Sequence, residues 1–150
     1  MKIHVKLISN SAKSNGGRAP TYATPCSAGA DLFAANEDDI VIKAGCRELI
    51  PTGIAIDIPE GFEGQIRSRS GLSAKFGVCV FNAPGTIDSD YRGEIKIVLA
   101  NFGENDFVVT NGMRVAQLVI APHQKVEWEI TEDLGKTERD SGGFGSTGLK

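Results

Sequence analysis

The sequence predicts a single all-β domain, and three observations support this prediction. Apolar and polar residues alternate with a period of two in several short runs, as they do in strands with one buried face. Clusters of Pro, Gly, Asn and Asp separate these runs at the short spacing of a β-sandwich or barrel. No sustained helical period is present, and 150 residues, 41% of them hydrophobic, suffice for one domain with a sizeable core.

The individual elements follow from these patterns in chain order. Alternation predicts half-buried strands at residues 3–7, 39–43, 54–58 and 126–130. Residues 94–101 and 113–121 are more continuously apolar, which is typical of strands buried on both faces. The one short helical candidate is 71–76, and the polar residues 9–24 are predicted to form a long surface loop.

The last part of the chain loses the apolar alternation and is dominated by glycine and polar residues. Such a segment cannot pack a core, and alone it should be mobile. It nevertheless carries side chains suited to bind phosphate and to stack on a base, namely Arg139, Phe144, Ser146 and Thr147. We therefore divide the chain into a β-barrel domain, residues 1–134, and a flexible glycine-rich arm, residues 135–150.

Charge and cysteine content narrow the possible partners and compartment. A net charge of −3 argues against sequence-independent binding of nucleic acid, which needs many Lys and Arg contacts to phosphate. The three cysteines are odd in number and lack any C-x-x-C spacing, so the sequence suggests neither a disulfide framework nor a zinc site. No run approaches the length of a membrane span. We expect a cytoplasmic protein without a nucleic-acid or membrane partner.

One stretch, residues 82–97, sets two carboxylates beside an aromatic side chain between two predicted strands. Turn chemistry explains Pro84 and Gly85, because Pro presets φ and Gly tolerates positive φ. It does not explain Asp88, which together with Asp90 precedes Tyr91. From this stretch alone the two acids are as well explained as solvated turn residues.

Three other segments are also ambiguous when each is considered alone. Residues 67–75 end a strand and enter a possible helical turn, where backbone N–H groups and a guanidinium can hold phosphate, but alone the segment is better explained as an exposed basic edge strand. Asp31 lies in an otherwise small and apolar context. Gln117 lies inside an apolar strand, where its amide costs free energy unless its hydrogen bonds are made.

Taken together and in order, five segments resemble the five motifs of the homotrimeric deoxyuridine triphosphatases, the dUTPases. The segments are SAGADLFA, RSRSGLSAK, NAPGTIDSDYRGEI, RVAQLVI and RDSGGFGSTG, and the resemblance spans essentially the whole chain. It implies a distorted jelly-roll β-barrel that forms a homotrimer with shared active sites, each closed by a mobile C-terminal arm. The implied reaction is hydrolysis of dUTP to dUMP and diphosphate, which keeps uracil out of DNA and supplies dUMP for thymidylate synthesis.

The resemblance also implies roles for residues of the third motif. Asp88 would hold and deprotonate the water that attacks the α-phosphorus, as a general base within hydrogen-bond reach. Tyr91 would pack against the deoxyribose and leave no room for a 2′-hydroxyl. The uracil edge would be bound by Asn82, by backbone groups of Gly85, Thr86, Ile87 and Asp88, and near Lys96.

The remaining motifs supply the implied phosphate site. Arg69, Ser70 and Gly71 would contact the phosphates, with Ser70 stabilising charge on the oxygen between the α- and β-phosphorus. Gln117 would donate to the phosphate chain or to the water. Mg²⁺, the implied cofactor, would be held mainly by the triphosphate and water, with Asp31 acting through a bound water. From the arm, the γ-phosphate and the uracil would be covered by Arg139, Phe144, Gly145, Ser146 and Thr147.

The sequence shows one departure from the family pattern, and two alternatives to dUTP hydrolysis are considered beside the resemblance. The fifth motif has Asp140 where glycine is frequent, and an acid beside a triphosphate is mildly unfavourable. A related dCTP deaminase would need a glutamate five residues after Gly93, where this chain has Val98, and Glu94 has the wrong spacing. A non-catalytic nucleotide-binding regulatory trimer would not need a water-activating base such as Asp88.

Overall fold

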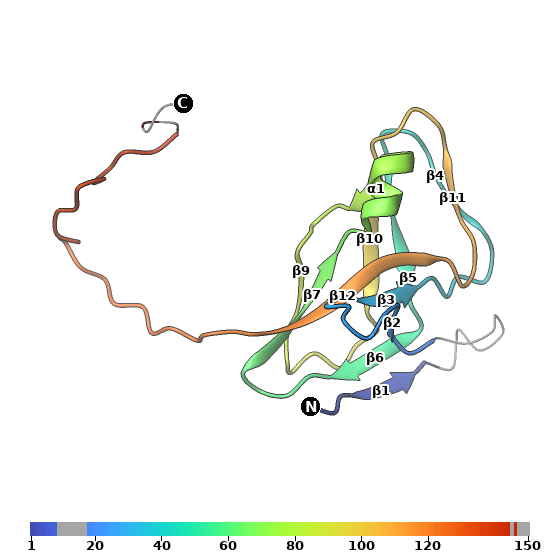
Figure 1. Cartoon of the computed structure of the whole chain (residues 1–150), viewed down its shortest axis with the longest axis horizontal. Helices are drawn as coiled ribbons and strands as arrows, with labels where there is room; N and C mark the ends of the chain where they lie inside the picture. Colours follow the sequence, from blue (N-terminus) through green and yellow to red (C-terminus); the bar gives the residue numbers. More distant parts are fainter. Residues whose placement is uncertain (9–17, 145, 147–150) are drawn as a thin grey trace.

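The computed structural model describes residues 1–8, 18–144 and 146, drawn in colour in Figure 1. In these residues the elements are β1 (His4–Leu7), β2 (Thr21–Tyr22), β3 (Ala30–Phe33), β4 (Ile40–Ile42), β5 (Arg47–Pro51), β6 (Ile54–Asp57), β7 (Phe62–Arg67), α1 (Ser70–Phe76), β8 (Val78–Val80), β9 (Gly85–Ile87), β10 (Lys96–Asn101), β11 (Phe107–Val109) and β12 (Arg114–Pro122). The predicted all-β class and the short helical candidate are both confirmed.

The strands form two main sheets that enclose one core. A five-stranded sheet has the order β2-β3-β12-β7-β9, and a three-stranded sheet has the order β5-β10-β8. Two-stranded ladders, β1-β6 and β11-β4, complete the barrel seen in Figure 1. The interior is filled mainly by branched aliphatic side chains, among them Leu32, Ile42, Ile50, Ile54, Ile66, Val78, Ile95, Ile97, Leu99 and Val115.

Most predicted strands are confirmed in place, but the strand predicted at 126–130 is wrong. The runs at 3–7, 39–43, 54–58, 94–101 and 113–121 correspond to β1, β4, β6, β10 and β12. Residues 126–130 pair with no strand of the described chain, and Val126, Trp128 and Ile130 are 56%, 89% and 99% exposed. Alternation of apolar and polar residues indicates that one face of a strand is suited to burial. It does not show that another strand lies beside that face to bury it.

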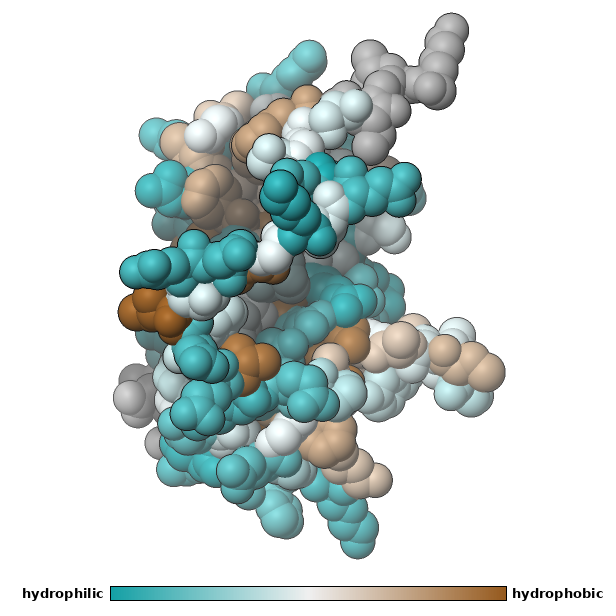
Figure 2. All heavy atoms as spheres, turned by 90° about the vertical axis from the view of Figure 1, so that its left-hand side faces the viewer, coloured by the Kyte–Doolittle hydropathy of each residue, from teal (hydrophilic) through white to brown (hydrophobic). Residues whose placement is uncertain are grey.

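After β12 the chain leaves the barrel and runs outward, as Figure 1 shows. Between His123 and Phe144 the structure contains neither a helix nor a strand. Figure 2 views the molecule from the side toward which this segment extends, and the surface seen there, with the segment in the foreground, is mostly hydrophilic with hydrophobic side chains in separate spots. Within the described residues, no helix has the length and apolar character that crossing a bilayer requires.

Candidate active site

The five-stranded sheet aligns three motif segments in one row. Gln117 of β12 is paired with Asp31 of β3 on one side and with Arg67 of β7 on the other. Directly opposed residues of antiparallel strands present their side chains on the same face, so Asp31 and Gln117 lie together. They help to line an open cavity of about 380 Å³. We call it the arginine pocket, and its lining residues are Ala23, Ser27, Ala28, Gly29, Asp31, Arg69, Ser70, Gly71, Arg114 and Gln117.

Asp31 holds two guanidinium groups in this pocket. Its Oδ1 accepts a hydrogen bond from Arg69 Nε at 3.0 Å, and its Oδ2 accepts one from Arg114 Nη1 at 3.1 Å. Arg69 also donates through Nη1 to the backbone carbonyl of Arg114 at 3.1 Å. Because one carboxylate faces two guanidinium groups, the cluster keeps a net positive charge with donors suited to an anion.

Arg114 is a pocket residue that the sequence pattern does not predict. In a regular strand, side chains alternate between faces, so residues 114 and 117 would point in opposite directions. The pairing of β12 with β3 shifts register between Arg114 and Ala116. A β-bulge of this kind re-aims the side chain beside it, which brings Arg114 into the same pocket as Gln117. The RVAQLVI segment contains Arg114, but its spacing alone gives no sign of the bulge.

The amide of Gln117 is satisfied by the segment that precedes α1. Its Nε2 donates to the carbonyl of Ser68 at 2.8 Å, and the Ser68 hydroxyl oxygen in turn accepts from the Val80 amide at 2.9 Å. Gly29 makes room for this side chain, since a Cβ at that position would overlap Gln117 Oε1. Gln117 therefore helps to hold the chain that leads into Arg69.

The helix α1 begins at the pocket. Arg69 is its N-cap residue with extended φ and ψ, and Ser70 and Gly71 are the first two helical residues. Backbone N–H groups in a first helical turn lack acceptors within the helix. Ser70 and Gly71 line the arginine pocket, so the start of α1 borders the same space as the two guanidinium groups.

A second group of predicted residues gathers around the turn between β8 and β9. The Asn82 side chain lies over Gly85, where a Cβ would be 3.1 Å from Asn82 Nδ2. Thr86 and Ile87 follow in β9. Beyond the paired residues of β10 and β8, the Phe81 amide donates a hydrogen bond to the Val98 carbonyl at 2.8 Å. Continuing the same register places Lys96 opposite the turn between β8 and β9.

Asp88 follows β9 directly and forms a tight turn with Tyr91. The Tyr91 amide donates to the Asp88 carbonyl at 3.2 Å, and the Tyr91 hydroxyl donates to the Glu94 carbonyl at 2.8 Å. Asp88 lines a second open cavity, of about 1090 Å³, together with Asp57, Asp90, Arg92, His123 and Trp128 among others. Neither Arg69 nor Ser70 lines this second cavity.

Strand register shows how far apart Asp88 and the arginine pocket are within one chain. Ile87 is paired with Gly64, so the next residue, Asp88, comes level with Glu63. Arg69 lies six residues further along the chain from Glu63, beyond the other end of β7. At about 3.3 Å per residue this corresponds to roughly 20 Å. One chain therefore does not place Asp88 next to its own arginine pocket.

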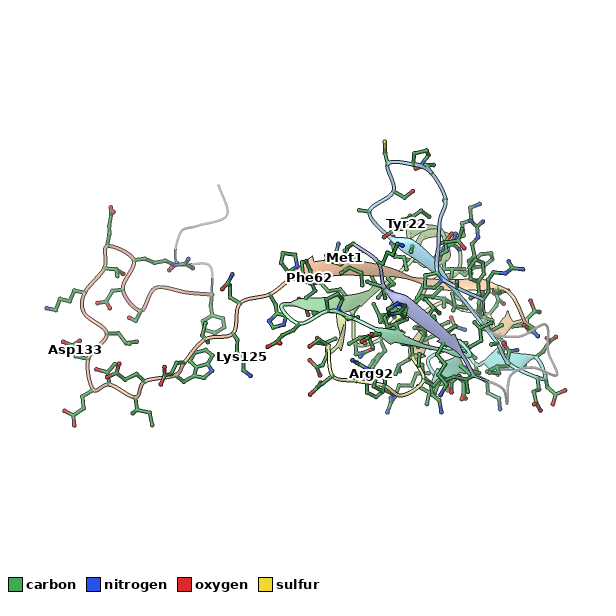
Figure 3. All side chains as sticks on the ribbon, turned by 90° about the horizontal axis from the view of Figure 1, so that it is seen from below. Met1, Tyr22, Phe62, Arg92, Lys125 and Asp133 are labelled. Atoms are coloured by element: carbon green, nitrogen blue, oxygen red, sulfur yellow. The ribbon has the colours of Figure 1, made fainter. Side chains whose placement is uncertain are left out.

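A third group lies on the arm, away from both cavities. Arg139 Nε donates to the Gly142 carbonyl at 2.9 Å, and Arg139 and Ser146 line an open cavity of about 460 Å³. Asp140 has φ of +44°, a conformation that favours glycine. In Figure 3 the arm, marked by Asp133, lies well away from Arg92 on the barrel. Gly145 and Thr147 lie outside the described residues.

The carboxylates near the arginine pocket indicate how the expected Mg²⁺ could be held. In the part of the chain that the structure describes, no group of three or more His, Cys, Asp or Glu side chains could hold a metal ion. Among the residues that the structure describes, Asp31 is the one carboxylate lining the arginine pocket, and both of its oxygens accept from arginine. These residues fit an ion held mainly by substrate phosphates and water rather than by a protein cage.

Comparison with known proteins identifies relatives over nearly the full chain. The family model for dUTPase matches residues 15–148. The deoxyuridine 5′-triphosphate nucleotidohydrolase of Anaplasma marginale is 58% identical over 146 residues, which cover 97% of this chain and 99% of that protein. The enzyme of the same name from Rickettsia bellii is 61% identical over 133 residues, 89% of each chain.

Solved structures show the same architecture. The dUTPase of Staphylococcus bacteriophage 80alpha with dUPNHPP has a TM-score of 0.86 and 28% identity, over 99% of both chains. A point mutant of the dUTPase from phage phi11 of S. aureus, described for its coordination of a structural Mg(II) ion, has a TM-score of 0.78 and 25% identity over 91% of this chain. The predicted jelly-roll-like fold is confirmed by these neighbours, whereas the trimer remains a prediction.

Proposed function

This chain belongs to the dUTPase family, and we propose that it hydrolyses dUTP to dUMP and diphosphate. The observation that carries the proposal is the arginine pocket, where Asp31 orients two guanidinium groups beside the start of α1. Such a pocket suits a polyphosphate, because charge-assisted hydrogen bonds and helical N–H donors converge on one anion. Three surfaces then share the reaction: this pocket, the Asp88 turn with the β8–β9 turn, and the arm.

The phosphate chain would lie in the arginine pocket. Arg69 and the amides of Ser70 and Gly71 would bind its oxygens, and the Ser70 hydroxyl would stabilise the oxygen that leaves the α-phosphorus. Negative charge develops on that oxygen during the reaction, so donors fixed in advance lower the barrier. Gln117, which already donates to the Ser68 carbonyl, would use its second amide hydrogen for a phosphate or for the attacking water.

The Asp88 turn would supply the base and the nucleoside recognition. Asp88 takes a proton from the water as it attacks the α-phosphorus in line with the departing diphosphate. Tyr91, held by its hydroxyl bond to the Glu94 carbonyl, packs on the deoxyribose and excludes a 2′-hydroxyl. Asn82 and the backbone from Gly85 to Asp88 bind the uracil edge, since fixed polar groups reject a base with mismatched donors.

Mg²⁺ bound with the triphosphate would neutralise phosphate charge during the reaction. Asp31 would hold one of its water ligands, as a carboxylate already oriented by Arg69 and Arg114. On the arm, Arg139 and Ser146, with Gly145 and Thr147, would clamp the γ-phosphate while Phe144 covers the base. Closing the arm excludes water and orders the triphosphate.

We propose a homotrimer in which each site combines residues of different chains. A separation of roughly 20 Å along β7 is too large for Asp88 and the arginine pocket of one chain to act on one phosphorus atom, because reacting groups must approach to about 3–3.5 Å. The hairpin of a second subunit would bring its own Asp88 to the pocket.

The three cysteines are free thiols, consistent with the cytoplasmic location that we propose.

The exposed apolar side chains that follow β12 also favour self-association. Val126, Trp128 and Ile130 alternate with Glu127 and Glu129, so they share one face of the extended chain. Full burial of a large apolar side chain contributes about 1.5–3 kcal/mol, and leaving several exposed in one segment is typical of an interaction surface. A neighbouring subunit supplies a surface on which this face can be buried.

Incubation with dUTP, dCTP or UTP tests the proposed function and its alternatives. We expect diphosphate release from dUTP with Mg²⁺, strong loss of rate when EDTA replaces Mg²⁺, and little turnover of UTP. Ammonia release from dCTP would instead identify a deaminase. Tight dUTP binding without product would identify a non-catalytic nucleotide-binding regulatory protein.

A further inference from the structure

The segment that carries Asp88 and Tyr91 is fastened along β6. At its C-terminal end, the Ile95 amide donates to the Ile54 carbonyl at 2.9 Å. Next to it, Glu94 Oε1 accepts from the Gly53 amide at 2.9 Å. These two bonds fix the segment where β6 begins, but they lie several residues from Asp88.

Arg92 fastens the other end, nearer to Asp88. Its Nη1 donates to the carbonyls of Ser89 and Tyr91 at 2.6 and 3.1 Å. Its Nη2 donates to Oδ1 of Asp57 at 2.6 Å, and Asp57 is the last residue of β6. One guanidinium thus joins two carbonyls of the turn to a carboxylate on the barrel. Figure 3 shows Arg92 on the barrel, far from the arm.

We propose that the Arg92–Asp57 pair positions the turn that carries Asp88 and Tyr91, and so controls turnover and sugar selection. The inference rests on the proposed function, because it concerns the residues to which that function gives the base and the sugar contact. Neither Arg92 nor Asp57 is a catalytic residue here. They act through the backbone of Ser89 and Tyr91, and only Arg92 touches that backbone.

The exposure of both side chains indicates that the Arg92–Asp57 pair positions the turn and contributes little to stability. The side chains of Arg92 and Asp57 are 57% and 48% exposed. Exposed ion pairs contribute little to stability, so breaking this one should leave the barrel folded. The neighbouring His4 Nδ1 lies 3.5 Å from Asp57 Oδ2 on a side chain that is 87% exposed, and it adds little.

The strand beneath the pair gives it a rigid base. Ile54 and Ile56 of β6 are buried, and β6 is paired with β1 along its length. By contrast, Tyr91 is 44% exposed, and the backbone bond that closes its turn runs from its own amide to Asp88. A planar guanidinium can serve three acceptors in fixed directions, whereas an ammonium group cannot reproduce that geometry.

The test uses the full-length enzyme with Asp57→Asn, Arg92→Lys, Arg92→Gln and the Asp57→Asn/Arg92→Gln double variant. Glu60→Gln is the matched control, because Glu60 lines the same cavity and loses the same charge without contacting Arg92 in the structure. Steady-state kinetics on dUTP and UTP are combined with thermal unfolding. Amide hydrogen exchange of residues 88–93 gives a readout that does not depend on activity.

We expect Asp57→Asn to lower kcat on dUTP about 10-fold and to reduce the preference for dUTP over UTP, since displacements near 1 Å can cost up to about 100-fold. KM and the unfolding temperature should change little, exchange at 88–93 should become faster, and Glu60→Gln should resemble the wild type. The double variant should be no worse than Arg92→Gln, because coupled residues are not additive.

Two results would overturn the inference. Asp57→Asn could match Glu60→Gln in kcat, sugar preference and exchange, or the effects of Asp57→Asn and Arg92→Gln could add independently. Both results are compared with those of the wild-type enzyme, provided that the wild type hydrolyses dUTP. A wild type without dUTP hydrolysis overturns the proposed function instead, and exchange at 88–93 still reports whether Asp57 holds the turn.

Discussion

Asp88 stands at the edge of a cavity rather than deep in the barrel, so its position depends on the turn around it. Asparagine keeps its size and most of its hydrogen bonds but cannot accept the proton of the attacking water. We therefore predict that Asp88→Asn keeps near-normal nucleotide affinity and lowers turnover by roughly 10²–10⁴-fold, the contribution of a general base. Asp90→Asn in the same turn is the control, and binding and single-turnover rates are the measurements. Activity close to wild type would remove Asp88 from its role as the base.

Tyr91 is the residue expected to select the sugar. Removing its ring in Tyr91→Ala opens space beneath the sugar, so we predict increased activity on UTP relative to dUTP. Tyr91→Phe keeps the ring but loses the hydroxyl bond to the Glu94 carbonyl, and it should retain most of the selectivity. The measurement is the ratio of kcat/KM for the two nucleotides. An unchanged ratio in Tyr91→Ala contradicts steric selection.

Among the elements, the chain before β3 approaches β12 closely at Gly29 and Gln117. Gln117 in turn holds the second motif segment through the Ser68 carbonyl. A Cβ at Gly29 would overlap Gln117 Oε1, so Gly29→Ala must displace the Gln117 side chain from the Ser68 carbonyl. We predict a loss of about 1 kcal/mol of stability, typical of one hydrogen bond, together with weaker phosphate binding. Thermal unfolding and KM for dUTP measure the two effects.

The same substitution in a Gln117→Ala background supplies the control. With the amide group removed, Gly29→Ala meets only the Cβ of residue 117, at 3.2 Å, and should cause a much smaller further change. If it causes the same loss of stability and affinity in both backgrounds, the effect does not pass through Gln117. The element that would then be responsible is the loop before β3 itself.

At the scale of the whole molecule, shared sites can be tested by mixing two defective chains. Asp88→Asn has an arm but no base, and a chain truncated after Glu138 has a base but no arm. Co-expression should yield mixed trimers in which some sites combine Asp88 of the truncated chain with Arg139 and Phe144 of the other. We predict that activity reappears in these mixtures above that of either parent, because intact base and arm meet in one site.

Analytical ultracentrifugation of the wild type and of each parent is the control for assembly. If hairpin and arm come from one chain, no site in a mixture holds both. Mixed trimers no more active than their parents would then refute the shared-site arrangement. A monomeric wild type that hydrolyses dUTP would refute it as well, because its site could then contain residues of one chain only.

The difference between Arg114 and Gln117 shows why the site could be predicted only in part. Gln117 was found because a lone amide in an apolar strand stands out in the sequence. Arg114 was missed because a bulge, formed by pairing with β3, turns it into the same pocket. Asp57 and Arg92 were likewise invisible, since a contact between residues so far apart in sequence depends on how β6 and the turn pack.

Local patterns in the chain are enough to predict the all-β class, most strands, the short helix and the five ordered motifs, because period-two burial and turn chemistry are local properties. Which motif residues share a pocket depends on how the strands pack. This packing joins Asp31, Arg69 and Arg114, keeps Asp88 at a separate cavity, and leaves residues 126–130 exposed although their alternation predicts a strand. The physical reason is that alternation fixes which face of a strand is suited to burial, whereas register and partner depend on packing between residues distant in the chain.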